Sequence, residues 1–192
     1  MLLKSKKALL ICEICGIFFV SACSLFMSRL YELSGKNLVG VMFGSVNHSV
    51  WESCKLLLLP YLLWSLIELL SLSPHMRRFT AVKTLSLYFL GLSYICARLF
   101  FGYEHQSAIT AVVCSAAAFA LSFLLYCSKP DFSALFPPSV FLLFLFWAIY
   151  LSFTPFPPKN IIFLDPKTGL YGIIPRHIDL GAAALDTLYY FS

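Results

Sequence analysis

Five long apolar runs, which fill most of this 192-residue chain, constrain its fold more than any motif does. A bilayer hydrocarbon core is about 30 Å thick, so a helix that rises about 1.5 Å per residue needs about 20 apolar residues to cross it. The runs span residues 8–28, 50–72, 80–101, 108–127 and 137–154. Backbone polar groups in lipid must be bonded within their own segment, and no run shows the alternation of a membrane barrel. We therefore predict an all-α polytopic membrane protein, a five-helix bundle in which residues 1–192 form one transmembrane domain.

The composition excludes a soluble globular protein, because 60% of the residues are hydrophobic, only 12% are charged and the mean hydropathy is +0.84. No soluble segment combines a basic patch with interleaved aromatic residues, so the net charge of +5 does not indicate nucleic-acid binding. We expect membrane lipids as partners and no nucleic acid. A protein partner stays unknown at this point.

The positive charges predict an orientation, because short cytoplasmic loops retain Lys and Arg. One set of flanks carries Lys4, Lys6, Lys7, Arg77, Arg78, Lys83 and Lys129. The opposite set carries Arg29, Lys36, Lys159, Lys167 and Arg176, of which the last three lie in a longer tail where the rule weakens. We predict a multi-pass cell-membrane protein with a cytoplasmic N-terminus and an outside C-terminus.

The first run has an alternative interpretation as a cleaved signal, because a basic start and an apolar core lead to Val20-Ser21-Ala22-Cys23. Glu13 interrupts that core, and the apolar residues continue through Leu25-Phe26-Met27 beyond any cut. These two observations favour a retained helix.

Seven cysteines fall almost entirely inside the runs, where Cys behaves as a small apolar residue. They are Cys12, Cys15, Cys23, Cys54, Cys96, Cys114 and Cys127. We predict free thiols. The C-x-x-C spacing of the first two admits a redox or metal role, but on a helix it also simply places two small residues on one face.

Residues 29–49 connect the first two runs and contain Gly35, Gly40 and Gly44. Within them, the apolar stretch Leu38–Phe43 is too short to cross a bilayer. We expect it to lie in the outer interface or to re-enter the membrane.

The start of the second run holds the most informative polar residues. Ser49 and Glu52 have the spacing of a capping box, in which each side chain bonds the other residue's backbone N–H. His48, Glu52 and Lys55 are four and three residues apart, so helical winding would also align them on one stripe. A charge at the bilayer centre costs about 2.5–3.5 kcal/mol on insertion scales, so Lys55 either snorkels to the interface or faces a partner.

Matching depths suggest partners for this stripe. Arg98, Glu104 and His105 fall at the end of the third run and just after it, which the predicted topology places level with His48, Glu52 and Lys55. The two sets form either one polar pocket or an ion-pair network that clips two helices together. We also expect a kink at Pro60, and the N-terminus of this helix offers N–H groups to an anion beside Lys55.

A second polar set lies near the cytoplasmic side. Glu13 and Glu68 are each about one turn from that face, and Lys83 has a similar depth. We interpret this set as structural, with an inner gate as the alternative.

The segment after the fifth run carries turn chemistry. Asp165-Pro166 with Gly169 three residues after the proline predicts a structured outer loop. The last stretch, Ile178–Phe191, contains Asp179 and Asp186 and is too short to cross, so we expect an interfacial or re-entrant piece.

Two stretches together carry a family resemblance. They read Phe43-Gly44-x-x-Asn47-x-Ser49-x-Trp51-Glu52-x-x-Lys55 and Pro157-Pro158, Phe163, Asp165-Pro166 and Thr168-Gly169-x-Tyr171-Gly172. In order and spacing they resemble domain of unknown function family 6512, small multispanning bacterial membrane proteins. The family's usual pattern has an acidic residue between the Asn and the Ser and a His after the Trp-Glu pair, where this chain has His48 and Ser53. Because two likely ligands are replaced, we expect no metal and no cofactor. The resemblance implies that both stretches belong to one outer feature but implies no activity.

Three functional hypotheses remain open. The first is binding of a small anion or lipid head group in an outer-leaflet pocket, with Asn47, Trp51, Glu52, Lys55 and Arg98 as ligand-binding residues and Asp165, Thr168 and Tyr171 as a lid. The second is a membrane-embedded lipid hydrolase or transferase, with His48, Glu52, Glu104 and His105 as catalytic candidates, although no G-x-S-x-G, H-E-x-x-H or P-loop motif is present. The third is a structural or accessory subunit of a membrane complex.

Overall fold

The protein is described by a computed structural model that covers residues 2–35, 37–72, 74–102 and 107–173. Its helices are α1 (Leu2–Leu33), α2 (Leu38–Phe43), α3 (Val50–Leu72), α4 (Met76–Phe101), α5 (Ser107–Cys127), the 3₁₀ helix η1 (Phe132–Leu135) and α6 (Phe136–Ser152). In these residues, the extended pairing outside the helices is one antiparallel bridge between Leu164 and Tyr171. The prediction of an all-α fold is confirmed.

Five of the described helices are long and apolar enough to cross a membrane, and each contains most of one predicted run. The run at residues 50–72 coincides with α3. Two others underestimate their helices, because α1 reaches from Leu2 to Leu33 and α4 already begins at Met76. Charged residues such as Arg77 and Arg78 end an apolar run but continue a helix, so the hydropathy limits are narrower than the helices.

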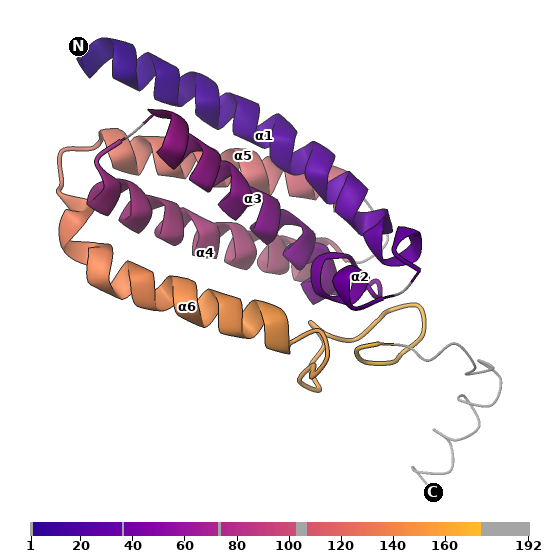
Figure 1. The fold of residues 1–192 in the computed structure, drawn as a ribbon. Coiled ribbons are helices and arrows are strands. Elements are labelled where there is room, and N and C mark those ends of the chain that lie inside the picture. Colours follow the sequence, from indigo (N-terminus) through magenta and orange to yellow (C-terminus); the bar gives the residue numbers. More distant parts are fainter. Residues whose placement is uncertain (1, 36, 73, 103–106, 174–192) are drawn as a thin grey trace, which may run out of the picture.

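The long helices run side by side in a bundle (Figure 1), in which α3 and α4 lie centrally, α1 and α5 pack together against them, and α6 packs on α4. The N-terminus and η1 lie at one end of the bundle, and α2 and the segment after α6 lie at the other. We call these the η1 end and the α2 end. The helices alternate in direction, which suits five crossings of one membrane; which end faces the cytoplasm stays a prediction.

The packing is that of a membrane bundle, with polar groups inside and large apolar side chains outside. Tyr61 and Phe119, whose rings lie 4.8 Å apart, are fully enclosed where α3 meets α5. By contrast, Phe18, Phe100 and Phe144 are 72%, 87% and 73% exposed on the outer faces. So much exposed apolar surface requires a covering of lipid.

The connection between α1 and α3 contains the predicted short apolar segment as α2. Asn37 caps this helix by accepting a hydrogen bond from the backbone N–H of Gly40 at 3.1 Å. Gly44 ends the helix in a tight return, because a Cβ there would lie 2.7 Å from both Gly40 O and Tyr31 N. The segment is therefore a helical cap packed on the end of α1.

Two further expectations have plain outcomes. α3 runs from Val50 to Leu72 as one helix with the buried Pro60 inside it. All seven cysteines are free thiols. The terminal stretch Ile178–Phe191 lies outside the described residues.

Candidate functional site

The first turn of α3 forms half of the predicted capping box. Ser49 Oγ accepts a hydrogen bond from the Glu52 N–H at 3.3 Å. The Ser49 N–H, however, donates to Asn47 Oδ1 at 2.9 Å, and the Glu52 carboxylate accepts from the Val46 N–H at 3.1 Å. The reciprocal half of the capping box is therefore wrong, because Asn47 takes the position that Glu52 would fill.

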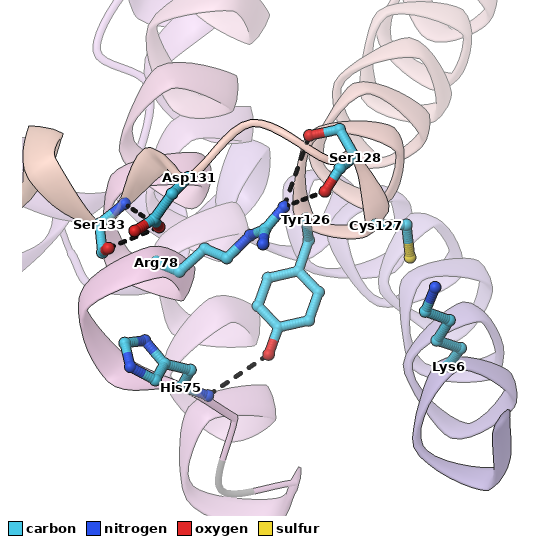
Figure 2. A pocket seen from close by; sticks show the side chains of 8 residues that line it. All are labelled: Lys6, His75, Arg78, Tyr126, Cys127, Ser128, Asp131 and Ser133. Carbon is cyan, nitrogen blue, oxygen red and sulfur yellow. Dashed lines mark hydrogen bonds between the residues drawn. The ribbon is translucent and has the colours of Figure 1, made fainter. Parts of the chain in front are cut away.

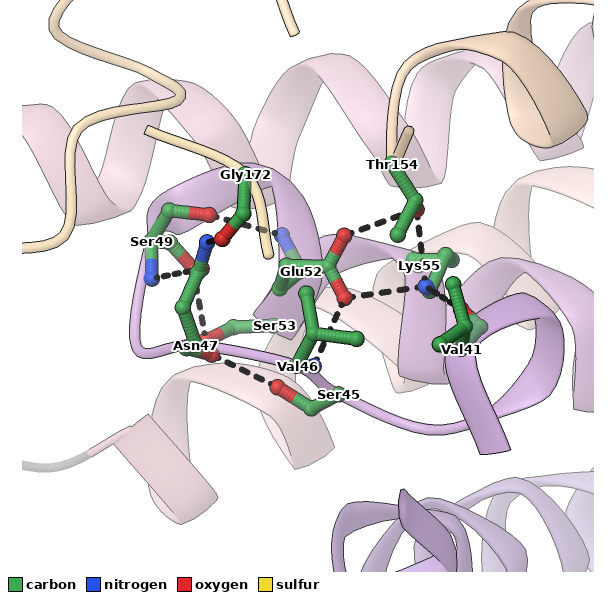
Figure 3. Close-up of polar contacts among 10 residues, drawn as sticks. All are labelled: Val41, Ser45, Val46, Asn47, Ser49, Glu52, Ser53, Lys55, Thr154 and Gly172. Carbon is green, nitrogen blue, oxygen red and sulfur yellow. Dashed lines mark hydrogen bonds and ion pairs between the residues drawn. The ribbon is translucent and has the colours of Figure 1, made fainter. Parts of the chain in front are cut away.

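Glu52 is turned instead into the bundle toward Lys55 (Figure 3), and Lys55 Nζ lies 2.9 Å from Glu52 Oε2. The same ammonium donates to Thr154 Oγ1 at 2.9 Å and to Val41 O at 3.2 Å, and Thr154 donates to Glu52 Oε1 at 2.8 Å. The Lys55 side chain is 0% exposed, so it does not snorkel. Its three N–H donors all have acceptors, which is the condition for keeping an ammonium inside a bundle.

The loop after α6 docks on this turn. Asn47 Nδ2 donates to Gly172 O at 2.9 Å, and the backbone N–H of Trp51 donates to Ile162 O at 3.0 Å. The Trp51 ring also packs against Phe153 and Phe163, with centroids 5.3 and 5.7 Å away. We call Asn47, Glu52, Lys55 and Thr154, with the backbone groups they bind, the polar clasp. It joins the two sequence stretches into one feature, as the family resemblance implied.

The loop holds its own shape through Asp165, which is buried. Its carboxylate accepts hydrogen bonds from the Lys167 N–H and the Thr168 hydroxyl, both at 3.0 Å. Its backbone N–H donates to Leu170 O at 3.0 Å, and Gly169 adopts a positive φ of 68° that closes the turn. Tyr171 lies exposed beside this turn.

The other predicted site residues lie outside the clasp or outside the described part of the chain. His48 precedes α3, is exposed, and lies with Nε2 3.1 Å from Lys167 Nζ, so it does not continue the Glu52–Lys55 stripe. Arg98 is buried near the end of α4, where its charge acts on Tyr94. Glu104 and His105 lie outside the described residues. Among the described residues, no hydrogen bond joins His48 to a carboxylate, as a general base and its partner would require.

The hydrogen-bond donors that an anion would need at the start of α3 are already engaged within the protein. The N–H groups of Trp51, Glu52 and Ser53 bind Ile162 O, Ser49 Oγ and Ser49 O, respectively. The Lys55 ammonium is saturated as described above. The start of α3 thus uses its helix-end donors within the protein.

An open cavity of about 320 Å³ lies beside the clasp at the α2 end. Its walls come from four of the long helices and the turn before α3: Ser24, Leu25, Ser28, Ser45, His48, Ser53, Leu56, Leu57, Tyr94, Ala108 and Ala111. Sequence reasoning singled out only His48 among them for function. Ser24 and Ser28 are four residues apart on one face of α1, but nothing in the sequence shows that this face meets Ser53.

The four cavity serines share one hydrogen-bond arrangement. Each hydroxyl donates to a backbone carbonyl: Ser24 to Ser21 O at 2.9 Å, Ser28 to Leu25 O at 2.7 Å, Ser45 to Asn47 O at 2.7 Å and Ser53 to Ser49 O at 3.1 Å. A hydroxyl has one proton and two lone pairs, so these oxygens have only acceptor capacity left. The polar part of the cavity is therefore rich in acceptors.

The set Glu13, Glu68 and Lys83 comes together in the other half of the bundle, as its matching depth suggested. Lys83 Nζ lies 2.8 Å from Glu13 Oε2 and 2.5 Å from Glu68 Oε2, and the Ser122 hydroxyl donates to Glu13 Oε1 at 3.0 Å. All three charged side chains are at most 5% exposed. We call these three residues the buried triad.

A wider cavity of about 460 Å³ lies at the η1 end (Figure 2), with Lys6 on α1 on one side and Arg78 on α4 on the other. The Arg78 guanidinium donates to the backbone carbonyls of Leu125 and Ser128 and so ties α4 to the end of α5. Hydrogen bonds from the Ser133 hydroxyl and N–H lower the pKa of Asp131 beside it.

Comparison with known proteins gives a family match. The model of a family described as a family of unknown function (DUF6512) matches residues 1–173. No curated protein and no solved structure matches the chain. Within the described residues, no group of three or more His, Cys, Asp or Glu side chains is placed to hold a metal ion.

Proposed function

This chain belongs to the DUF6512 family, whose function is unknown, and we propose that it binds the polar head group of a lipid in the cavity at the α2 end. The observation that carries this proposal is the set of four serines that line a cavity of about 320 Å³ between apolar helix faces. That volume is within the range of about 300–1,000 Å³ that small-molecule sites occupy.

The position of the cavity favours a lipid over a dissolved solute. Its lining residues lie within about two and a half turns of the helix ends, and in a spanning bundle this is near the level where head groups meet the bilayer core. Leu25 of α1 and Ala108 of α5 line it and are exposed, so in the described part of the chain its walls continue onto the outer face. A head group can therefore lie in the cavity while its acyl chains follow the apolar surfaces of α1 and α5.

The hydrogen-bond arrangement favours a head group that donates. Four serine oxygens offer lone pairs, which suit ammonium or hydroxyl donors. A small anion needs free N–H or O–H groups, and the expected ones on Lys55 and the α3 N-terminus are engaged in the clasp. We therefore favour an ammonium- or hydroxyl-bearing head group over the anion.

The docked loop closes one rim of the cavity in this proposal. Lys167 can only donate, so its contact with His48 Nε2 makes that nitrogen an acceptor and leaves the ring proton on Nδ1. Asp165 and Thr168 hold the turn that positions Lys167. In this proposal the loop is a lid that the clasp anchors to the start of α3.

The test compares lipids that differ in one property, using the purified chain in nanodiscs and native mass spectrometry. Phosphatidylethanolamine has N–H donors that phosphatidylcholine lacks, and phosphatidic acid adds negative charge without an ammonium. We expect preferential retention of phosphatidylethanolamine over phosphatidylcholine, about ten-fold for the loss of one to two hydrogen bonds. Preference for phosphatidic acid would instead favour the anion hypothesis and contradict this proposal.

Variants identify the site of retention. Ser24→Ala with Ser28→Ala removes two acceptors, and Ala111→Phe fills the space without removing a polar group. Ser21→Ala is the matched control, because Ser21 makes the same kind of bond to Ile17 O but does not line the cavity. Equal retention by all these variants would favour the structural-subunit hypothesis.

A further inference from the structure

The buried triad carries more negative than positive charge. Two carboxylates and one ammonium leave one uncompensated negative charge if all three ionise. An uncompensated charge inside a bundle is costly, and two carboxylates close to one another do not ionise independently. The simplest neutral state holds one additional proton.

The ammonium of Lys83 is the fixed charge of the triad. It faces both carboxylates and lies 5.5, 5.5 and 5.1 Å from the ring centroids of Tyr61, Phe79 and Phe119. Aromatic faces stabilise a cation, most strongly when water is excluded. Lys83 thus neutralises one carboxylate and leaves the proton to the other.

The two carboxylates are not equivalent. Both oxygens of Glu13 accept hydrogen bonds, one from Lys83 and one from Ser122, which suits an ionised group. Glu68 contacts Lys83 through Oε2, but no hydrogen bond of good geometry reaches its Oε1 from the described residues, because the neighbouring Trp64 Nε1–H donates to Cys12 O at 3.0 Å. A buried, unpartnered oxygen is far less costly on a protonated carboxyl than on a carboxylate.

A second polar group lies beside the triad. The Tyr61 hydroxyl is fully buried, is within reach of the Ser86 and Ser122 hydroxyls, and is close enough to Glu13 and Glu68 to experience both charges. Tyr61 is both a donor and an acceptor, so it is able to serve either form of the triad.

We propose that Glu13, Glu68 and Lys83 form an exchangeable proton-binding site inside the membrane, with the proton carried by Glu68. Binding forms one O–H bond on the Glu68 carboxylate, and release returns the proton to water. This site is separate from the lipid cavity at the α2 end and does not depend on the proposed function.

Other groups near the triad that titrate are few. Cys12 and Cys15 lie on α1, Cys12 close enough to interact with all three charges, and Tyr61 lies on α3. From α5 the triad meets Phe119 and Ser122, which do not titrate. Replacing both cysteines with alanine therefore removes the two titrating thiols of α1 and leaves Tyr61 in place.

The η1 end is the nearer source of protons. A small cavity of about 150 Å³ reaches Lys83 and is bordered by Phe79. The Phe79 ring lies 6.2 Å from that of Tyr126, which lines the wide cavity at the η1 end. Phe79 thus neighbours both Lys83 and a wall residue of the wide cavity.

The test is infrared difference spectroscopy of the full chain in nanodiscs, with the C=O stretch of protonated carboxylic acids as readout, over roughly pH 5 to 9. The Cys12→Ala/Cys15→Ala background should show one buried protonated carboxyl. The band should disappear in Glu68→Gln and also in Glu13→Gln, because one carboxylate then neutralises Lys83. Lys83→Met should raise its intensity about two-fold, since two carboxyls then need protons.

Glu32→Gln, on an exposed carboxyl of the same helix as Glu13, is the matched control and should leave the band unchanged. A wild-type spectrum without the band would mean that both carboxylates stay ionised and the triad only clips helices together, which overturns the proposal. A band that survives both glutamine variants overturns it equally. The Glu68→Gln variant keeps the Glu13–Lys83 ion pair, which has no net charge, so we expect this variant to fold.

Discussion

Lys55 and Thr154 are separated by 99 residues in the chain, yet Lys55 Nζ donates to the Thr154 hydroxyl at 2.9 Å inside the bundle. The same hydroxyl donates onward to Glu52. The Thr154 hydroxyl accepts a hydrogen bond from the ammonium and donates one to the carboxylate. It therefore bridges an ion pair that is shielded from solvent. We expect the free energy of unfolding to depend on this bridged ion pair at the α2 end.

Lys55→Met should destabilise the protein by about 3–5 kcal/mol, because it leaves the Glu52 carboxylate buried without its cation. Adding Glu52→Gln should restore most of that loss, since the pair is then removed as a whole. Equilibrium unfolding in mixed detergent micelles measures both. Lys159→Met, at an exposed lysine, serves as the control, and a double variant as unstable as the single one would contradict the ion-pair account.

Asn47→Ala should loosen the loop after α6, because the buried Asn47 amide no longer donates to Gly172 O. A lost buried hydrogen bond costs about 1–3 kcal/mol, which should expose Lys159 and Lys167 to trypsin several-fold faster. The matched control is Asn160→Ala, at an exposed asparagine of the same loop. Equal cleavage rates for the two variants would show that Asn47 does not hold the loop.

Gly44→Ala should destabilise the turn that leads into α3, by about 1–3 kcal/mol. The new Cβ would lie 2.7 Å from two backbone atoms, Gly40 O and Tyr31 N, which cannot move independently of their helices. Gly91→Ala is the comparison, because its Cβ would meet Leu58 Cδ2 at an ordinary 3.5 Å. Thermal unfolding should separate the two variants clearly, and similar values would refute the close approach.

Single cysteines introduced at Lys129 and Lys159 in a cysteine-free chain should react from opposite sides of the membrane. The two residues follow helices that end at opposite ends of the bundle. The charge distribution predicts that Lys129 is cytoplasmic, so its replacement should react with an impermeant maleimide only after permeabilisation. Reversed labelling would invert the predicted orientation.

Phe79→Ala should accelerate hydrogen–deuterium exchange at the buried triad several-fold, because the ring neighbours both Lys83 and Tyr126, and its loss opens space between the triad and the η1-end cavity. The deuterium shift of the protonated carboxyl band gives the rate. Phe89→Ala, at an exposed position of the same helix, is the control. Unchanged exchange in Phe79→Ala would place the route for protons elsewhere.

The number and type of the spanning helices could be predicted from the sequence, because a bilayer imposes a length and an apolarity that any span must satisfy. Local pairs could be predicted as well: Glu52 and Lys55 are three residues apart and do form an ion pair. His48 failed to join them because α3 begins at Val50, so the helical spacing does not extend back to His48.

The long-range partners could not be predicted. Thr154 follows α6, and Ser122 lies on α5 in an apolar run, and neither position distinguishes the residue from other hydroxyls of the chain. Only the packing of α6 and α5 against the other helices brings these two hydroxyls to Glu52 and Glu13. Depth matching did relate Glu13, Glu68 and Lys83, because depth is set by the membrane and requires no knowledge of helix order.

The sequence separation of 102 positions from Glu52 to Thr154 has a consequence for biosynthesis. A ribosome delivers α3 to the bilayer long before it makes Thr154, so the nascent pair enters lipid without the hydroxyl that bridges it. Assembly of the α2 end must then be completed after the final helix has been inserted. A nascent chain stalled before Thr154 would therefore be a substrate for membrane quality control even though four of its five spans are already in place.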